Sequence, residues 1–128
     1  MRILGFALST LVLVCASDLS SQKPVEQDEQ KCCCTTVDTG QCLIKVRSRV
    51  DKELNEIYQK AMTGQDEKGK TLLRKAQRSW ISYRDADCEG EQHTYEGGSM
   101  AGNMGAFCEI RLTRQRIAEI NYVYLDEH

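Results

Sequence analysis

Apolar side chains recur every three or four residues in three long segments, which is the spacing of one face of an α-helix. The segments run from about residue 41 to 62, from 67 to 89 and from 100 to 124. The apolar positions of the first are Leu43, Val46, Val50, Leu54, Ile57, Tyr58 and Ala61. Those of the second are Leu73, Ala76, Trp80 and Tyr83, and those of the third are Phe107, Ile110, Ile117, Ala118, Asn121 and Tyr124. No segment alternates as a half-buried strand does, so the pattern predicts an all-α fold.

Residues at the segment ends are typical of helix termini. Thr39, Asp66 and Ser99 are candidate N-caps, because their side-chain oxygens can accept from free backbone N–H groups. Gly64 and Gly90 suit the left-handed position that ends a helix. The link between the first two segments is short, which predicts that these helices pack antiparallel. We therefore expect a small antiparallel three-helix bundle.

The N-terminal segment "MRILGFALSTLVLVCAS" has one early positive charge and an apolar run too short to span a bilayer. It predicts a signal peptide over residues 1–16 and therefore an exported protein, periplasmic or secreted. A lipid anchor at Cys15 is the alternative, although Val14 precedes it where a small residue is usual. Residues 17–40 form a polar, cysteine-containing leader, and residues 41–124 form the helical domain.

The charge of the chain bounds its partners. The formal net charge is −2 and the sequence pI is about 5.7, whereas a nucleic-acid binder needs a basic face. We therefore expect no nucleic-acid partner. No other segment is apolar enough to cross a membrane.

Six of the seven cysteines remain after removal of residues 1–16, and an even number in a small exported chain predicts disulfides. Antiparallel packing brings the start of the first helix and the end of the second to the start of the third. Cys88 and Cys108 therefore predict one bridge. We predict that Cys42 forms a second bridge with Cys32, Cys33 or Cys34. We assign Cys34 as its partner, and the other two stay open. A metal–thiolate site is a weaker hypothesis, because the "CCC" spacing does not match the paired motifs of zinc sites.

The stretch "QRSWISYRDADC", residues 77–88, is the densest in the chain. We interpret Trp80 and Tyr83 as core anchors, and we expect Arg84 to pair with a carboxylate such as Glu109 or Glu119. Asp85 and Asp87 diverge around a helix and do not form the facing carboxylates of glycoside hydrolysis.

Candidates for catalysis are weak. Ser99 lacks the strand–turn–helix setting of a nucleophile, His93 lies in a polar loop, and the glycine-rich segment lacks a P-loop lysine. We expect no catalytic, metal or cofactor site, and the protein is predicted not to be an enzyme.

The chain resembles the LprI-type lysozyme inhibitor family, N-terminal domain. The most specific motifs of the resemblance are "DKELNEIYQK", "QRSWISYRDADC" and "C…LTRQRIAEI", in that order, and the segment "EGGSMAGNMGAFC" contributes to it as well. The matching residues are Leu54, Tyr58, Gln77, Trp80, Tyr83, Arg84, Cys88, Cys108, Thr113 and Arg116. The departure is "CCC", where family members usually carry one cysteine.

The resemblance implies an exported protein that binds and blocks a lysozyme-type muramidase. The candidate binding loop is Glu91–Gly105, in which His93, Tyr95, Ser99 and Asn103 are the candidate contacts. The alternative is an envelope interaction module that binds another envelope protein or a wall fragment and has no effect on lysozyme.

Overall fold

The computed structural model describes residues 36–126, with side chains from Asp38 onward. This range contains three helices, α2 (Thr36–Thr63), α3 (Glu67–His93) and α4 (Ala101–Tyr124), and no strand. The predicted all-α helical bundle is therefore confirmed. The predicted signal peptide, the alternative lipid site at Cys15 and the cysteines Cys32, Cys33 and Cys34 lie outside the described residues.

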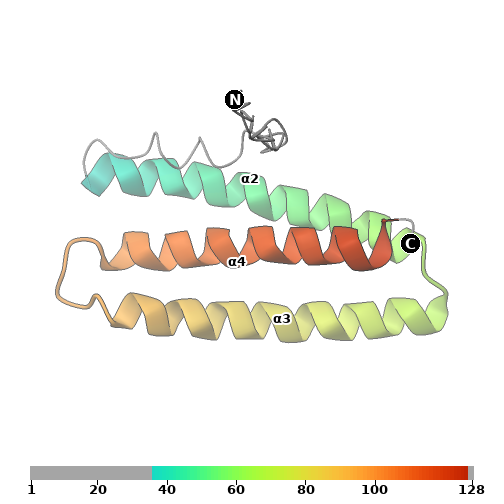
Figure 1. Cartoon of the computed structure of the whole chain (residues 1–128). Coiled ribbons are helices and arrows are strands. Elements are labelled where there is room, and N and C mark those ends of the chain that lie inside the picture. The colour runs from blue at the N-terminus through green and yellow to red at the C-terminus, as the bar shows by residue number, and fades with distance from the viewer. Residues whose placement is uncertain (1–35, 127–128) are drawn as a thin grey trace, which may run out of the picture.

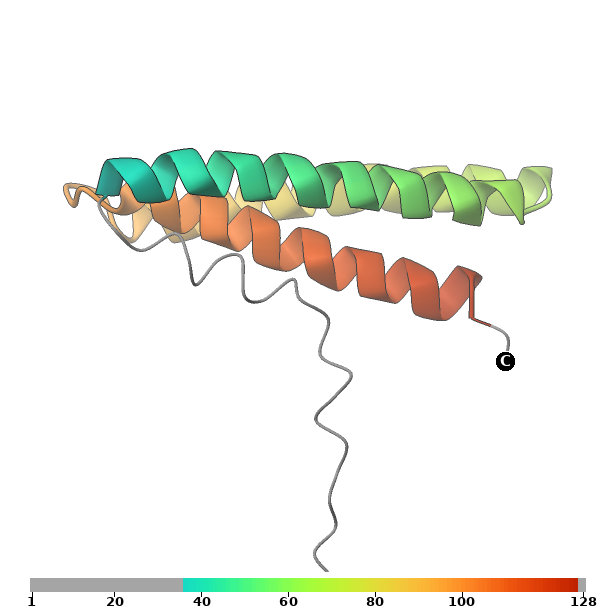
Figure 2. The ribbon, with the colours of Figure 1, turned by 90° about the horizontal axis from the view of Figure 1, so that it is seen from above.

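Helix α4 packs along both of the other helices, whereas α2 and α3 contact each other little (Figure 1). Helices α2 and α4 run in the same direction and α3 runs in the opposite one (Figures 1 and 2). The prediction that the first two helices run antiparallel is confirmed. Their direct packing is only slight, because α4 rather than α3 covers the apolar face of α2.

The core consists of three clusters arranged along α4. Near the start of α2, the side chains of Leu43, Val46 and Val50 pack on Ile110 of α4. A second cluster joins all three helices through Leu54, Ala61, Leu73, Ile117 and Ile120. The third joins α3 to α4 through Cys88, Cys108 and Leu112, and Trp80 packs against both of the last two clusters. Burial of these apolar side chains is the main force that orders the helices.

The helix ends differ in part from the predictions. Asp66 caps α3 as expected, since its Oδ1 accepts from the backbone N–H of Gly69 at 2.7 Å. Thr39 does not cap α2, because the helix begins at Thr36 and Thr39 is buried inside it. Residues 36–40 therefore belong to α2 and not to the leader. Ser99 does not cap α4; Met100 is at that position and makes no side-chain cap bond.

Two glycines were assigned to the wrong role. Gly97 is the only glycine of the described residues with positive φ, so Gly64 does not adopt a left-handed conformation. Gly90 does not end α3, which continues to His93. A glycine inside a helix costs only about 1 kcal/mol relative to alanine, which the tertiary contacts of this end of α3 offset.

The apolar stripe of α3 was also placed wrongly. Its buried residues are Leu73, Gln77 and Cys88, with Trp80 and Arg84 partly buried. Ala76 and Tyr83 are exposed, Tyr83 by 55%. The stripe includes two polar residues, and each has a partner on a neighbouring helix: Arg116 donates to Gln77 at 3.0 Å, and Arg84 reaches Asp51 at 3.5 Å.

Candidate functional site

The end of the bundle where α3 passes into α4 is held by a covalent bond. Cys88 and Cys108 form a disulfide with an S–S distance of 2.06 Å and a Cα–Cα distance of 5.4 Å, as the sequence predicted. Both cysteines are buried. Cys42, near the start of α2, is also disulfide-bonded; its predicted partner Cys34 lies outside the described residues.

Residues 94–100, which we call the tip, connect α3 to α4 beyond this bridge. All seven are exposed. Their backbone is nevertheless hydrogen-bonded in successive turns: Tyr95 N–H donates to Gln92, Glu96 N–H to His93 and Gly98 N–H to Tyr95, at 3.0–3.1 Å. Gly97 turns the chain with φ 84°, a conformation that glycine adopts without steric cost. The tip is therefore an ordered protrusion.

The four predicted contact residues do not all belong to this protrusion. Tyr95, 45% exposed, and Ser99 lie in the tip, and exposed His93 is the last residue of α3. Asn103 is in α4, is 8% exposed and packs close to Gly40 of α2. The predicted loop, Glu91–Gly105, extended into both helices, whereas the connection has only seven residues, so Asn103 lies in a helix and its side chain is mostly buried.

Nδ1 of His93, at the end of α3, and Oε2 of Glu96, in the tip, are 2.8 Å apart, a contact that is an ion pair when the imidazole is protonated. Both side chains are exposed. They line a shallow hollow of about 770 Å³ together with Glu89, Gly90 and Gln92 on the outer side of α3. This hollow adjoins the tip, since Glu96 belongs to both.

The last part of α3 is strongly acidic. Residues 85–96 contain five carboxylates and no lysine or arginine; they are Asp85, Asp87, Glu89, Glu91 and Glu96. Asp85 pairs with Arg84 and Glu91 with Arg111 of α4. Among the described residues, Asp87 and Glu89 make no ion pair. The tip is thus flanked by net negative charge, which favours a basic partner surface.

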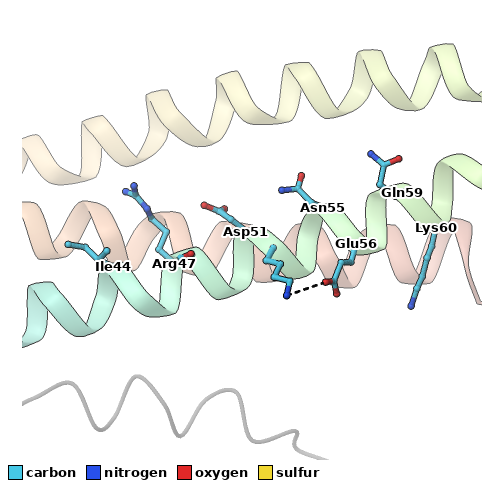
Figure 3. A pocket seen from close by; sticks show the side chains of 9 residues that line it. Ile44, Arg47, Asp51, Asn55, Glu56, Gln59 and Lys60 are labelled. Carbon is cyan, nitrogen blue, oxygen red and sulfur yellow. Dashed lines mark ion pairs between the residues drawn. The ribbon is translucent and has the colours of Figure 1, made fainter.

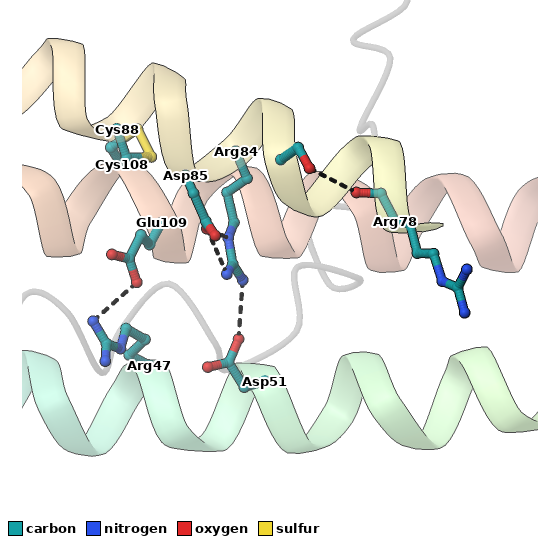
Figure 4. A network of polar contacts seen from close by, with 9 residues as sticks. Arg47, Asp51, Arg78, Arg84, Asp85, Cys88, Cys108 and Glu109 are labelled. Carbon is teal, nitrogen blue, oxygen red and sulfur yellow. Dashed lines mark hydrogen bonds and ion pairs between the residues drawn. A yellow bond between two sulfur atoms is a disulfide. The ribbon is translucent and has the colours of Figure 1, made fainter. Parts of the chain in front are cut away.

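The stretch Gln77–Cys88 holds the helices together (Figure 4). The guanidinium of Arg84 lies over the Trp80 ring, donates to Asp85 at 2.8 and 2.9 Å, and reaches Asp51 of α2. The predicted partners were wrong, because Glu109 is paired with Arg47 and Glu119 with Arg116. Tyr83 is not a core anchor; its exposed hydroxyl donates to Asp87 at 3.4 Å.

Two other hollows lie away from the tip. The larger, about 860 Å³, is lined by nine residues that all belong to α2. Figure 3 shows Asp51 and Asn55 on the side of this helix that faces α3, and Glu56 and Lys60 on the opposite side. A second hollow, of about 410 Å³, is a groove lined by residues of α2 and α3. Asn55 and Tyr58 line it from α2, and Arg74, Gln77 and Arg78 from α3.

Comparison with known proteins agrees with the resemblance seen in the sequence. Residues 28–120 match the family described as lysozyme inhibitor LprI. The chain belongs to the LprI family. An uncharacterized protein of Rhizobium meliloti (strain 1021) is 34% identical over 133 aligned residues, which cover 94% of each chain. No solved structure is significantly similar.

The residues that carry the LprI resemblance are mainly those that build the fold. Cys88 and Cys108 form the bridge, Trp80 and Arg84 form the contact between α3 and its neighbours, and Gln77 receives the hydrogen bond from Arg116. The resemblance also includes "EGGSMAGNMGAFC", which covers the second half of the tip, and the family match over residues 28–120 includes the whole tip. Most of the matching residues therefore belong to the scaffold that holds the tip.

Within residues 36–126, no cluster of three His, Cys, Asp or Glu side chains is arranged to hold a metal ion. None of the three helices is long and apolar enough to cross a membrane.

Proposed function

We propose that the protein is an exported inhibitor that binds a lysozyme-type muramidase through the tip and its acidic flank. The observation that carries the proposal is the geometry of the tip, seven exposed residues held by turn hydrogen bonds beyond a buried disulfide. Family membership supports the class of target. The predicted signal peptide supports export.

A rigid protrusion is suited to fill a cleft. Ordering a flexible loop on binding costs about 0.5–1.5 kcal/mol for each side chain immobilised. Ordering the backbone of the loop adds a further entropic cost. The bridge and the turn hydrogen bonds remove most of this backbone cost before binding. The backbone of the tip therefore loses little conformational freedom when it enters the cleft.

The chemistry of the tip suits a cleft that contains carboxyl groups. Lysozyme-type hydrolysis uses two carboxyl groups, one protonated and one ionised. The hydroxyl groups of Tyr95 and Ser99 can donate to them without adding charge. Glu96, the one carboxylate within the tip, contacts His93, and a protonated imidazole there reduces its repulsion of the enzyme's carboxylates.

The acidic flank serves a different part of the interface. The carboxylates of Asp87 and Glu89 lie on α3, behind the tip, and would meet the rim of the cleft. A basic rim is attracted by these charges, which accelerates association. We therefore expect the target to be a muramidase whose cleft is surrounded by lysine and arginine residues.

The direct test is a lysis assay with residues 17–128, disulfides intact, titrated against lysozyme-type muramidases acting on a peptidoglycan suspension. The expected result is competitive inhibition, with KM raised and kcat unchanged. The matched control replaces residues 94–100 by a Gly/Ser segment of equal length and keeps Cys88 and Cys108. No slowing of lysis at large molar excess rejects the function, and equal inhibition by the control rejects the tip as its site.

A further inference from the structure

The groove between α2 and α3 has features of a second binding site, distinct from the tip. Its volume of about 410 Å³ lies within the range of small-molecule sites, which is roughly 300–1,000 Å³. Asp51 is the only carboxylate that lines it, and Arg84 already pairs with that carboxylate. The groove therefore carries an excess of positive charge.

This excess resides on Arg74 and Arg78, one helical turn apart on α3. Both side chains are exposed, and among the described residues neither guanidinium makes a side-chain hydrogen bond or an ion pair within 4 Å. The pKa of the Glu67 carboxyl is lowered, mainly by Lys70, and Arg74 lies close enough for its charge to contribute. Figure 4 shows the guanidinium of Arg78 directed away from the network that holds Arg84. Arg74 and Arg78 also line an adjacent hollow of about 350 Å³ with Lys75. They form a ridge that an oxyanion can reach from both sides.

Neutral hydrogen-bonding groups stand beside the ridge. Asn55 and Tyr58 face it from α2, and Gln77 lies between the two arginines on α3. Arg116 donates to Oε1 of Gln77, so the amide nitrogen is the atom left to donate to a ligand. A ligand that satisfies all of these groups needs several hydroxyl or amide groups as well as one anionic group.

We propose that this groove binds a carboxylate-bearing oligosaccharide, with its carboxylate on Arg74 and Arg78 and its hydroxyl or acetamido groups on Asn55, Tyr58 and Gln77. Guanidinium groups bind carboxylates bidentately, which gives direction as well as charge. A simple inorganic anion would use the arginines and leave the neutral groups of the groove without a partner. The site does not depend on the tip or on inhibition of a muramidase.

The chain provides its own reporter, because Trp80 is its only tryptophan and lines the groove. The probe is the disaccharide of N-acetylglucosamine and N-acetylmuramic acid, which has one carboxylate. The matched probe without a carboxylate is the disaccharide of two N-acetylglucosamine units. Titrations follow Trp80 fluorescence, and calorimetry repeats each one.

We expect saturable binding of the acidic disaccharide and at least about tenfold weaker binding of the neutral one, since a hydrogen bond to a charged group is worth about 1.5–3 kcal/mol. The variant Arg74→Gln/Arg78→Gln should lose affinity by a similar factor. The control Lys52→Gln/Lys60→Gln removes the same charge from α2 outside the groove and should stay within about twofold of the wild type. The protein with the replaced tip should bind the acidic disaccharide unchanged.

Three outcomes would overturn the proposal. The first is no saturable binding of the acidic disaccharide by calorimetry or fluorescence. The second is equal affinity of the wild type and Arg74→Gln/Arg78→Gln, with both folded by circular dichroism. The third is displacement by inorganic phosphate at the same concentration as the disaccharide, which would identify a general anion site without recognition of a sugar.

Discussion

The guanidinium carbon of Arg84 lies 5.3 Å from the centre of the Trp80 ring, one turn further along α3. Both side chains lie on the face of α3 that turns inward. Trp80 packs on two core clusters, and Arg84 covers its ring while it reaches across to Asp51. Tyr83, only one residue before Arg84, points outward.

The first prediction tests this assignment with two aromatic residues of the same helix. Trp80→Ala should lower the free energy of unfolding by about 3 kcal/mol, because it opens a cavity between two clusters. Tyr83→Ala removes an exposed ring and should change it by about 0.5 kcal/mol or less. Urea denaturation of the disulfide-intact protein, followed by circular dichroism, gives both values. Equal losses in the two variants would contradict the orientation of α3.

The misplacement of this stripe shows what hydropathy can and cannot predict. Along α2 the buried face is apolar from Leu43 to Ala61, and its predicted positions are all buried or partly buried. On α3 the inward face includes Gln77 and Arg84, which have partners on other helices, Arg116 and Asp51, in addition to the contact of Arg84 with Asp85 on α3 itself. A search for apolar residues therefore selected Ala76 and Tyr83, because tertiary partners are not visible in one helix.

The candidate site was predictable to a similar degree. The Cys88–Cys108 bridge followed from the antiparallel order of the helices, and the position of the tip followed from the bridge. The length of the tip could not be predicted, because Gly90 and the glycines near residue 100 suggested a loop in places where α3 and α4 continue. The α2–α3 groove was not foreseen, since it depends on how far α4 keeps those two helices apart. The number of arginines on one side of α3 is the signal that could have indicated it.

Gly90 and Gly97 provide the second prediction, because they differ in conformation and both have open space. A Cβ added at either residue meets no atom within 4 Å. Gly90 is inside α3, so Gly90→Ala should raise the free energy of unfolding by about 0.5–1 kcal/mol. Gly97 has φ 84°, so Gly97→Ala should lower it by about 1 kcal/mol. Thermal unfolding compares the two, and stabilisation by Gly97→Ala would contradict the turn described for the tip.

The third prediction concerns the bridge that anchors the tip. Cys88→Ser/Cys108→Ser opens a loop of 20-residue sequence separation and should cost about 3 kcal/mol, mainly through the entropy of the unfolded chain. Inhibition should weaken more than the unfolded fraction explains, because the tip then pays an ordering cost on binding. Inhibition constants are measured at a temperature where circular dichroism shows the variant folded. An unchanged constant there would show that the bridge does not preorganise the binding surface.

The fourth prediction separates the two ends of the molecule. Tyr95 in the tip and Tyr122 near the end of α4 are both well exposed. Tyr95→Ala should weaken inhibition about tenfold or more, as expected for an aromatic residue at the centre of an interface. Tyr122→Ala should leave the inhibition constant unchanged, since it lies at the far end of the bundle (Figure 1). The reverse result in the lysis assay would move the interface away from the tip.

The fifth prediction concerns the charge behind the tip. Asp87→Asn/Glu89→Gln removes two carboxylates from the acidic flank, and Glu56→Gln/Asp126→Asn removes two from outside it as a control. If the flank steers the protein toward a basic rim, the first variant should bind the muramidase more slowly, with little change in the dissociation rate. The difference between the two variants should shrink as ionic strength rises, because exposed charges separated by more than about 8 Å are largely screened at 0.15 M salt. Surface plasmon resonance at 20 and 300 mM salt measures these rates. If the slower association persisted unchanged at the higher salt, the flank would act through direct contact and not by local steering. If it appeared equally in the control, the overall charge would explain it.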